Sequence, residues 1–135
     1  MEFLTSAGSR FEIPRECWEG AGMIGWDRRA KRHYDPCIGA NFEVIATSLI
    51  EPPRRSAGVD LLNFDRLGSI LHSFVVPQRL PPIQISGPWL QRKFPYRLRD
   101  GCHRFYATIA AGFPEIPSEI IDVQTHQSMI DEGLP

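Results

Sequence analysis

The sequence lacks long hydrophobic runs, a surplus of charge of either sign, and a cysteine framework. Its apolar runs are only a few residues long, far short of the ~20 residues that cross a bilayer. Residues 1–5 show neither the basic nor the apolar part of a secretory signal. Fifteen Lys and Arg against 16 Asp and Glu leave a net charge of -1, which excludes a uniformly basic coat for nucleic acid. Three cysteines without a CxxC pair predict a reducing, cytoplasmic location, and no association with a membrane is predicted.

What is present is enough for one domain with a real core. The chain has 135 residues, of which 42% are hydrophobic. Charge is uneven, because residues 36–99 hold eight basic and four acidic side chains, whereas residues 100–135 hold one basic and six acidic. The basic middle indicates either an anion-facing surface or an ordinary solvated face. His33 and Cys37 have metal-ligand spacing, but no second pair completes a site, so no metal centre is predicted.

Hydrophobic periodicity predicts strands and helices in a mixed order. Apolar residues at helical spacing predict an amphipathic helix over 61–74, capped by Asp60 or Asn63, and a second helix that ends at Gly112. Strands are predicted at 42–46, 82–86, 94–98 and 116–123, with a further short strand at 11–13. Four apolar residues of the first 40 are expected to anchor that segment on the core: Trp18, Met23, Ile24 and Trp26. These elements predict the α+β class, with a mixed sheet and flanking helices.

The segment Asp100–Arg104 carries the clearest chemical signal. The chain leaves a strand, passes through Gly101 and enters a helix. The first turn of a helix has N–H groups without an internal partner, and its dipole favours negative charge, so such a corner can bind phosphate. His103 and Arg104 can add charge-assisted hydrogen bonds, and Cys102 lies where a thiolate is favoured. The ordinary alternatives are that His103 caps the turn, that Arg104 forms a salt bridge and that Asp100 caps the helix.

These residues resemble the ParB/sulfiredoxin superfamily. Gly101–Arg104, followed by an aromatic residue and Ala107, resembles the Gly-Cys-His-Arg turn of sulfiredoxins. Asp100–Arg104, followed by the Ala-Ala-Gly segment at 110–112 and the Ile-Pro pair at 116–117, resembles the longer ParB-like pattern. Weaker likenesses lie upstream, in Ile50–Arg54, Leu67–Ile70 and Pro81–Ile85.

The resemblance implies an organisation for the whole chain. It implies a single ParB/sulfiredoxin-like domain over residues 42–124, an N-terminal extension over 1–41 packed on the core, and a tail over 125–135. It also implies that Gly101, Cys102, His103 and Arg104 bind ATP, another nucleotide or a phosphorylated small molecule, together with Mg²⁺. Phosphoryl transfer or phosphodiester or nucleotide hydrolysis is the reaction expected there, with Asp100 or Glu51 as base or metal ligand.

Two other functions stay open beside this one. The first is a non-enzymatic, DNA-associated binding or regulatory module of the ParB-like kind. The second is a sulfiredoxin-like, ATP-dependent reductase of cysteine sulfinic acid that uses Cys102 as its nucleophile. Because members of one fold differ in their reactions, the resemblance alone does not choose among the three.

Two further groups of residues are candidates. Glu51 is either a base or metal ligand, or the ion-pair partner of Arg54 or Arg55, and these two arginines are candidate phosphate ligands. A predicted hairpin interleaves basic and aromatic side chains: Arg92, Lys93, Arg97 and Arg99 with Trp89, Phe94 and Tyr96. That mixture suits either a nucleotide base or single-stranded nucleic acid, or else a solvated hairpin with one buried face.

Overall fold

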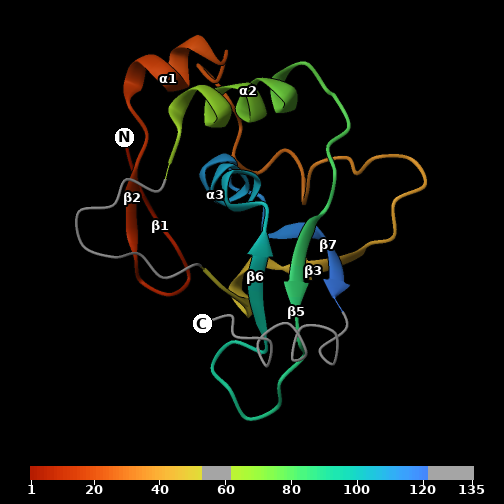
Figure 1. Ribbon diagram of the computed structural model, residues 1–135. Coiled ribbons are helices and arrows are strands. Elements are labelled where there is room, and N and C mark those ends of the chain that lie inside the picture. The colour runs from red at the N-terminus through yellow and green to blue at the C-terminus, as the bar shows by residue number, and fades with distance from the viewer. Residues whose placement is uncertain (53–61, 122–135) are drawn as a thin grey trace.

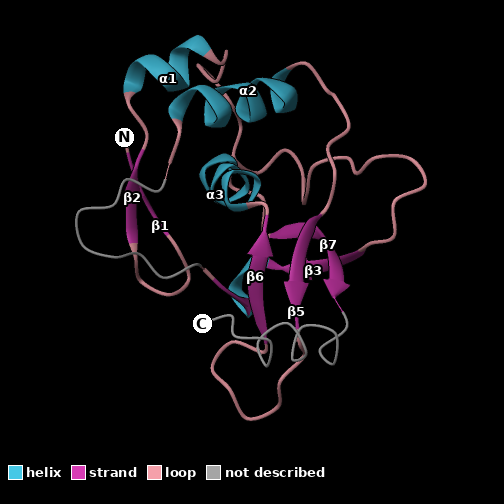
Figure 2. Ribbon diagram, viewed as in Figure 1, coloured by secondary structure: helices cyan, strands magenta, loops and turns pink. Residues whose placement is uncertain are grey.

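A five-stranded mixed sheet, a small hairpin and three α-helices make up the computed structural model, which describes residues 1–52 and 62–121 (Figures 1 and 2). The sheet runs in the order β3-β7-β5-β6-β4, and its strands are β3 (Glu43–Ala46), β4 (Ile50–Glu51), β5 (Ile83–Ser86), β6 (Tyr96–Asp100) and β7 (Glu115–Ile121). β3 and β7 are antiparallel, as are β5 and β6, whereas β7 and β5 are parallel, as are β6 and β4. This arrangement confirms the predicted α+β class with a mixed sheet and flanking helices.

Helix α2 (Phe64–Val75) is the helix that the sequence predicted at 61–74. Asn63 caps it, because its side-chain oxygen accepts hydrogen bonds from the N–H groups of Asp65 (3.0 Å) and Arg66 (3.1 Å). Asp60, the alternative cap, lies outside the described residues. The helix buries its apolar stripe at Leu67, Leu71 and Phe74.

Helix α3 (Cys102–Ala111) lies between α2 and the sheet (Figure 1). Its inner positions are fully enclosed, with Phe105 at 1% exposure and Ala107 and Ala110 at 0%. Gly112 ends the helix in the left-handed conformation, as predicted, and Phe113 donates its N–H to the Thr108 carbonyl (3.1 Å). A helix held on two sides fixes the position of its first turn, and with it the corner at Asp100–Arg104.

The first 34 residues are part of the same core. They form a hairpin of β1 (Glu2–Leu4) and β2 (Arg10–Glu12) and a short helix, α1 (Arg15–Gly20). β1, α1 and the two-residue β4 were not predicted, because elements this short show no clear periodicity. The ring of Phe11 packs edge-on against Tyr106 of α3, with ring centroids 4.9 Å apart.

The expected anchors of this segment are mostly right. Trp18 and Met23 are buried, and Trp26 is half-buried and donates its indole N–H to the Ala111 carbonyl (2.9 Å). The prediction that Ile24 anchors this segment is wrong, because its side chain is 73% exposed. Among the helices of the described residues, none is long and apolar enough to span a bilayer.

Candidate functional site

Gly101 makes the corner between β6 and α3 possible. Its φ of +100° lies in the left-handed region, and a Cβ built there would stand 2.6 Å from Cγ2 of the buried Ile83. As a glycine it also supplies no side-chain hydrogen bond to cap the helix, and the first turn contains no acidic residue. The positive end of the helix dipole is therefore not offset by a capping side chain of residue 101 or by a carboxylate of the first turn.

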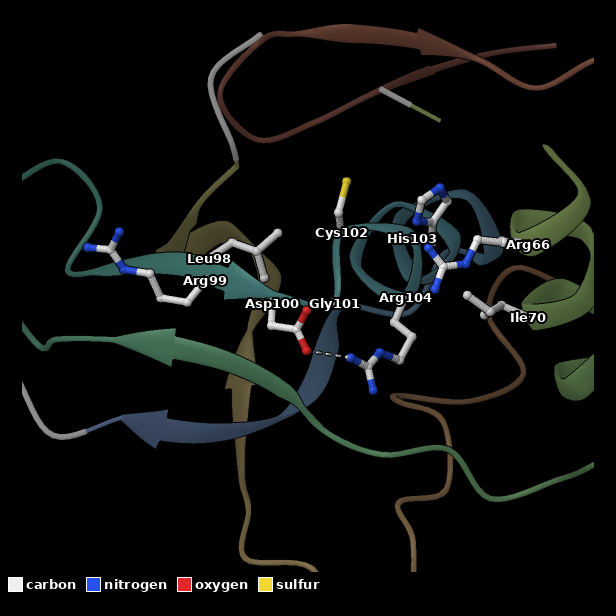
Figure 3. Close-up of a pocket in the computed structure, with 9 residues that line it drawn as sticks. All are labelled: Arg66, Ile70, Leu98, Arg99, Asp100, Gly101, Cys102, His103 and Arg104. Carbon is white, nitrogen blue, oxygen red and sulfur yellow. Dashed lines mark hydrogen bonds and ion pairs between the residues drawn. The ribbon is translucent and has the colours of Figure 1, made fainter. Parts of the chain in front are cut away.

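A cavity of about 530 Å³ opens at this corner (Figure 3). The described residues that line it are Arg66, Ile70, Leu98, Arg99, Asp100, Gly101, Cys102, His103 and Arg104. All five residues of the predicted Asp100–Arg104 motif thus meet in one cavity. Arg66 and Arg104 stand at the corner with a single carboxylate, that of Asp100, among the described lining residues, so the site favours an anion.

Arg104 is braced by the protein itself. Its side chain is only 17% exposed, and it donates to the Pro81 carbonyl (3.1 Å) and to Oδ2 of Asp100 (3.5 Å). Asp100 is 70% exposed at its side chain. A salt bridge was the ordinary alternative to phosphate binding that the sequence left open for Arg104, and the structure contains that salt bridge. The guanidinium ties the end of β6 and the start of α3 to the chain that leads into β5.

His103 faces the start of α2. Its Nε2 accepts the backbone N–H of Asn63 (2.9 Å), so the neutral ring carries its proton on Nδ1. Burial lowers the pKa of this imidazole, and the positive charge of Arg66 lowers it further. His103 is therefore a neutral ring that joins two helix starts and can donate one hydrogen bond from Nδ1.

Arg66 is the site residue that sequence reasoning missed. It lies in the first turn of α2, it is exposed, and its guanidinium stands beside the His103 ring (Figure 3). In the sequence it is one of two charged residues, Asp65 and Arg66, near the start of a predicted helix, 37 positions before His103. No local signal marks it, because only the packing of α2 on α3 brings it to the corner.

Cys102 and Arg99 occupy opposite parts of the lining. Cys102 is the first residue of α3 and is half-buried, and its thiol points to the side of the corner away from Arg104 (Figure 3). Arg99 extends away from the corner and donates to the Ser86 hydroxyl (2.8 Å). Burial lowers the pKa of the Arg99 guanidinium, and so do the charges of Arg97 and Arg92.

The other candidates lie away from this lining. Glu51 pairs in register with Arg97 on β6 and forms an ion pair with Arg92 (3.5 Å). Arg97, its neighbour in the sheet, is three residues before Asp100 on β6, so Glu51 lies roughly 10 Å along the strand from Asp100. Arg54 and Arg55 lie outside the described residues. Within those residues, no three His, Cys, Asp or Glu side chains gather as a metal-binding group.

The His103 geometry predicts a pH-dependent stability. The pKa of the folded ring lies below its ordinary value of 6.5, so as the pH falls the unfolded chain takes up the proton first. The stability that the neutral ring contributes is complete above about pH 6.5 and is lost as the pH falls through the folded-state pKa. Urea unfolding at about pH 7.5 and about pH 5 measures this loss.

His103→Gln is the matched variant for this experiment. Its side-chain oxygen can accept the same Asn63 N–H without titrating. We expect the stability difference between the native chain and His103→Gln to shrink or reverse at the lower pH. An unchanged difference at the two pH values would contradict the assignment of the ring as a buried acceptor.

Comparisons with known proteins give one structural likeness. No family model matches the chain, and no curated protein matches it by sequence. Among solved structures the chain is similar to the crystal structure of sulfiredoxin from Arabidopsis thaliana, with a TM-score of 0.48 and 19% sequence identity. The match covers 67% of this chain and 97% of that one. This is a likeness of fold at low identity, and it assigns no activity to the chain.

Proposed function

We propose that the protein binds the phosphate chain of a nucleotide at the corner between β6 and α3. The observation that carries the proposal is the convergence of a helix start without a side-chain cap, an imidazole and the guanidinium groups of Arg66 and Arg104 on one cavity. The positive end of a helix suits a phosphate. A cavity of about 530 Å³ also has the size of small-molecule sites.

The residues of the corner would have different roles in binding. The first-turn N–H groups of α3, Nδ1 of His103 and the exposed guanidinium of Arg66 would contact the phosphates directly. Arg104 would hold the corner in shape, because its donors already serve Pro81 and Asp100. Asp100 would share Mg²⁺ with the phosphates, since Mg²⁺ in such sites keeps several waters and takes few protein ligands.

Phosphoryl transfer or hydrolysis is the reaction class that fits this arrangement. Such reactions depend on positioning and on stabilising the charge of the transferred group, which helix N–H groups and a guanidinium can do. Asp100 is the only carboxylate among the described lining residues, and it would serve as base or metal ligand. Glu51 stays a prediction for that role, on a strand position roughly 10 Å along β6.

A thermal-shift experiment tests nucleotide binding. ATP, ADP, CTP and GTP are each added with and without Mg²⁺, and Tm is measured. At about 100 times its Kd a ligand adds about 2.7 kcal/mol to stability, so we expect a rise in Tm of roughly 5–10 °C. Arg66→Gln should remove most of that rise, because it deletes the exposed guanidinium at the corner.

Arg10→Gln is the control for this experiment. Arg10 lies on β2, exposed, and pairs with Glu2. An equal rise in Tm in Arg66→Gln, Arg10→Gln and the native chain would place the ligand elsewhere. If no nucleotide raises Tm at millimolar concentration, the proposed function is wrong.

A sulfiredoxin-like reductase is the second candidate, and the position of Cys102 favours it. The thiol lines the same cavity at the first position of α3, where the helix field favours a thiolate. Cys102→Ser should then retain the nucleotide-dependent rise in Tm and lose ATP-dependent reduction of a sulfinic acid on a partner protein, assayed with an added thiol as the source of electrons. Activity that survives Cys102→Ser would exclude Cys102 as the nucleophile, and absence of the activity in the native chain would exclude this reaction.

A further inference from the structure

A second basic surface lies beyond the corner, where β6 begins. It consists of Arg92, Lys93, Arg97 and Arg99, and we refer to it as the β6 basic surface. Arg97 and Arg99 are two residues apart on β6, so they share the face opposite the buried Leu98. Arg92 reaches the same place from the 87–95 loop, because it pairs with Glu51, which is in register with Arg97.

The charges on this surface are poorly balanced. Among the described residues, Arg92, Arg97 and Arg99 meet there with three positive charges, and Glu51 is the carboxylate among them. Lys93 adds a fourth positive charge next to Arg92 in the sequence. The Arg99 guanidinium lies close enough to Arg97 and Arg92 for their charges to lower its pKa. Like charges held together on an otherwise neutral chain indicate an anionic partner.

Planar side chains lie among these charges. The Arg92 guanidinium stacks over Trp89, with its carbon 5.1 Å from the ring centroid, and Lys93 lies over Phe94 at 5.6 Å. Beside them Leu90 is 87% exposed. The loop is ordered by its own backbone, since Trp89 donates its N–H to the Pro95 carbonyl (2.8 Å).

We propose that the β6 basic surface and Trp89 bind single-stranded nucleic acid. Arginines on a strand contact the phosphates, and the stacked Trp89 and Arg92 offer a flat platform for a base. The platform favours a nucleic acid over an acidic peptide, which would use the charges and leave the flat faces unused. Unpaired bases are needed for stacking, so a single strand fits better than a duplex.

Fluorescence anisotropy with a labelled oligo(dT) of about 20 nucleotides, at ~50 mM salt, tests the proposal. Arg97→Gln and Arg92→Gln should each weaken binding several-fold and reduce the slope of log K against log salt by about 0.7. Trp89→Ala should weaken binding about tenfold, the lower part of the range for one stacked base, with no change in slope. Trp89→Phe should retain most of the affinity, which separates stacking from damage to the loop.

Two controls isolate this surface. Arg10→Gln removes an equal charge from the β1–β2 hairpin and should leave the affinity unchanged. Arg66→Gln, which tests the nucleotide site, should also leave oligonucleotide binding unchanged. Failure of the proposed nucleotide site and failure of this surface can therefore be told apart.

Four results would overturn the proposal. One is no binding of oligo(dT) or oligo(U) up to about 100 µM at low salt, the weak end of non-specific affinities. Another is equal weakening in Arg10→Gln. A third is a duplex that binds as tightly as the single strand and ignores Trp89→Ala, which indicates charge alone. The last is binding to phosphatidylserine vesicles without binding to the oligonucleotide, which would assign the surface to a membrane.

Discussion

Gly101→Ala is expected to lower the free energy of unfolding by about 3 kcal/mol and to abolish ligand binding at the corner. The left-handed conformation costs an L-residue roughly 1–2 kcal/mol, and forcing an extra carbon into a packed site costs roughly 1–3 kcal/mol. Both costs apply, because φ is +100° and the new Cβ would stand 2.6 Å from Cγ2 of Ile83. Ile83 is 0% exposed, so it has little room to move away.

Ligand binding is lost for a separate reason. The same Cβ would stand 3.0 Å from the terminal nitrogen of Arg104 that bonds Asp100. We expect relief of this contact to displace the Arg104 guanidinium, which bonds Pro81 and Asp100, and to turn the first N–H groups of α3 away from the cavity. Urea unfolding measures the stability, and the nucleotide-dependent rise in Tm measures the site.

Gly25→Ala is the matched control for Gly101→Ala. Gly25 has a φ of +77°, and a Cβ there meets no atom within 4 Å. It therefore carries the conformational cost of roughly 1–2 kcal/mol without the steric cost. If Gly101→Ala is no more destabilising than Gly25→Ala, the contact with Ile83 is unimportant and the geometry described for the corner is wrong.

Gly112→Ala is expected to have an effect at least as large, about 3–5 kcal/mol, at the other end of α3. Its φ is +83°, and a Cβ there would overlap the carbonyl oxygen of Arg28 and stand 2.6 Å from the Arg28 Cβ. Both costs described for Gly101 apply here, and the obstacle includes backbone, which cannot rotate away. A loss of that size is a large part of the 5–15 kcal/mol that ordinarily stabilises a domain.

The contact with Arg28 adds to this cost. Arg28 donates from Nε to the Ala110 carbonyl (3.1 Å) and from a terminal nitrogen to the Ile109 carbonyl (3.1 Å). These bonds supply a donor to the Ala110 carbonyl near the helix end and a second donor to the Ile109 carbonyl, which also accepts the Gly112 N–H (3.0 Å). Displacement of Arg28 by the new Cβ loses them, together with their favourable charge at the negative end of the helix.

Two variants grade this prediction, again by urea unfolding. Gly39→Ala has nearly the same φ, +82°, with no atom within 4 Å of its Cβ, so it measures the conformational cost alone. Arg28→Ala keeps the glycine and removes the two bonds, and it should cost about 1–3 kcal/mol. Equal stability of Gly112→Ala and Gly39→Ala would show that the N-terminal segment does not press on the end of α3.

Signals within a few residues of sequence were enough to predict the helix ends and the turn at Asp100–Arg104. Asn63 was one of two predicted caps, Gly112 was predicted as a helix end, and Gly101 as the turn into α3, because each depends on hydrogen bonds within a few residues. The apolar spacing of Leu67, Leu71 and Phe74 likewise predicted the buried face of α2. The structure gathers Asp100–Arg104 around one cavity, and nucleotide binding there stays a prediction.

Other features had no local signal. β1, α1 and β4 have two to six residues, too few for a period to be recognised. Ile24 was expected to anchor the first segment because of its hydrophobicity alone, yet single apolar residues are common on protein surfaces. The role of the N-terminal segment at the end of α3 joins residues more than 80 positions apart, and no pattern in one sequence reports such a contact.

By itself, the sequence determined the α+β class, the helix ends and the residues of the corner, since glycine, asparagine and apolar spacing act over one or two turns of chain. Only the tertiary structure decided the chemistry that these residues can offer. In the structure, Nε2 of His103 accepts the Asn63 N–H, and Arg104 donates to Pro81 and Asp100. Arg66 is the guanidinium that packing brings to the cavity and that stays exposed there. The reason is that each choice depends on how α2, α3 and β5 pack, and packing joins residues that the sequence keeps far apart.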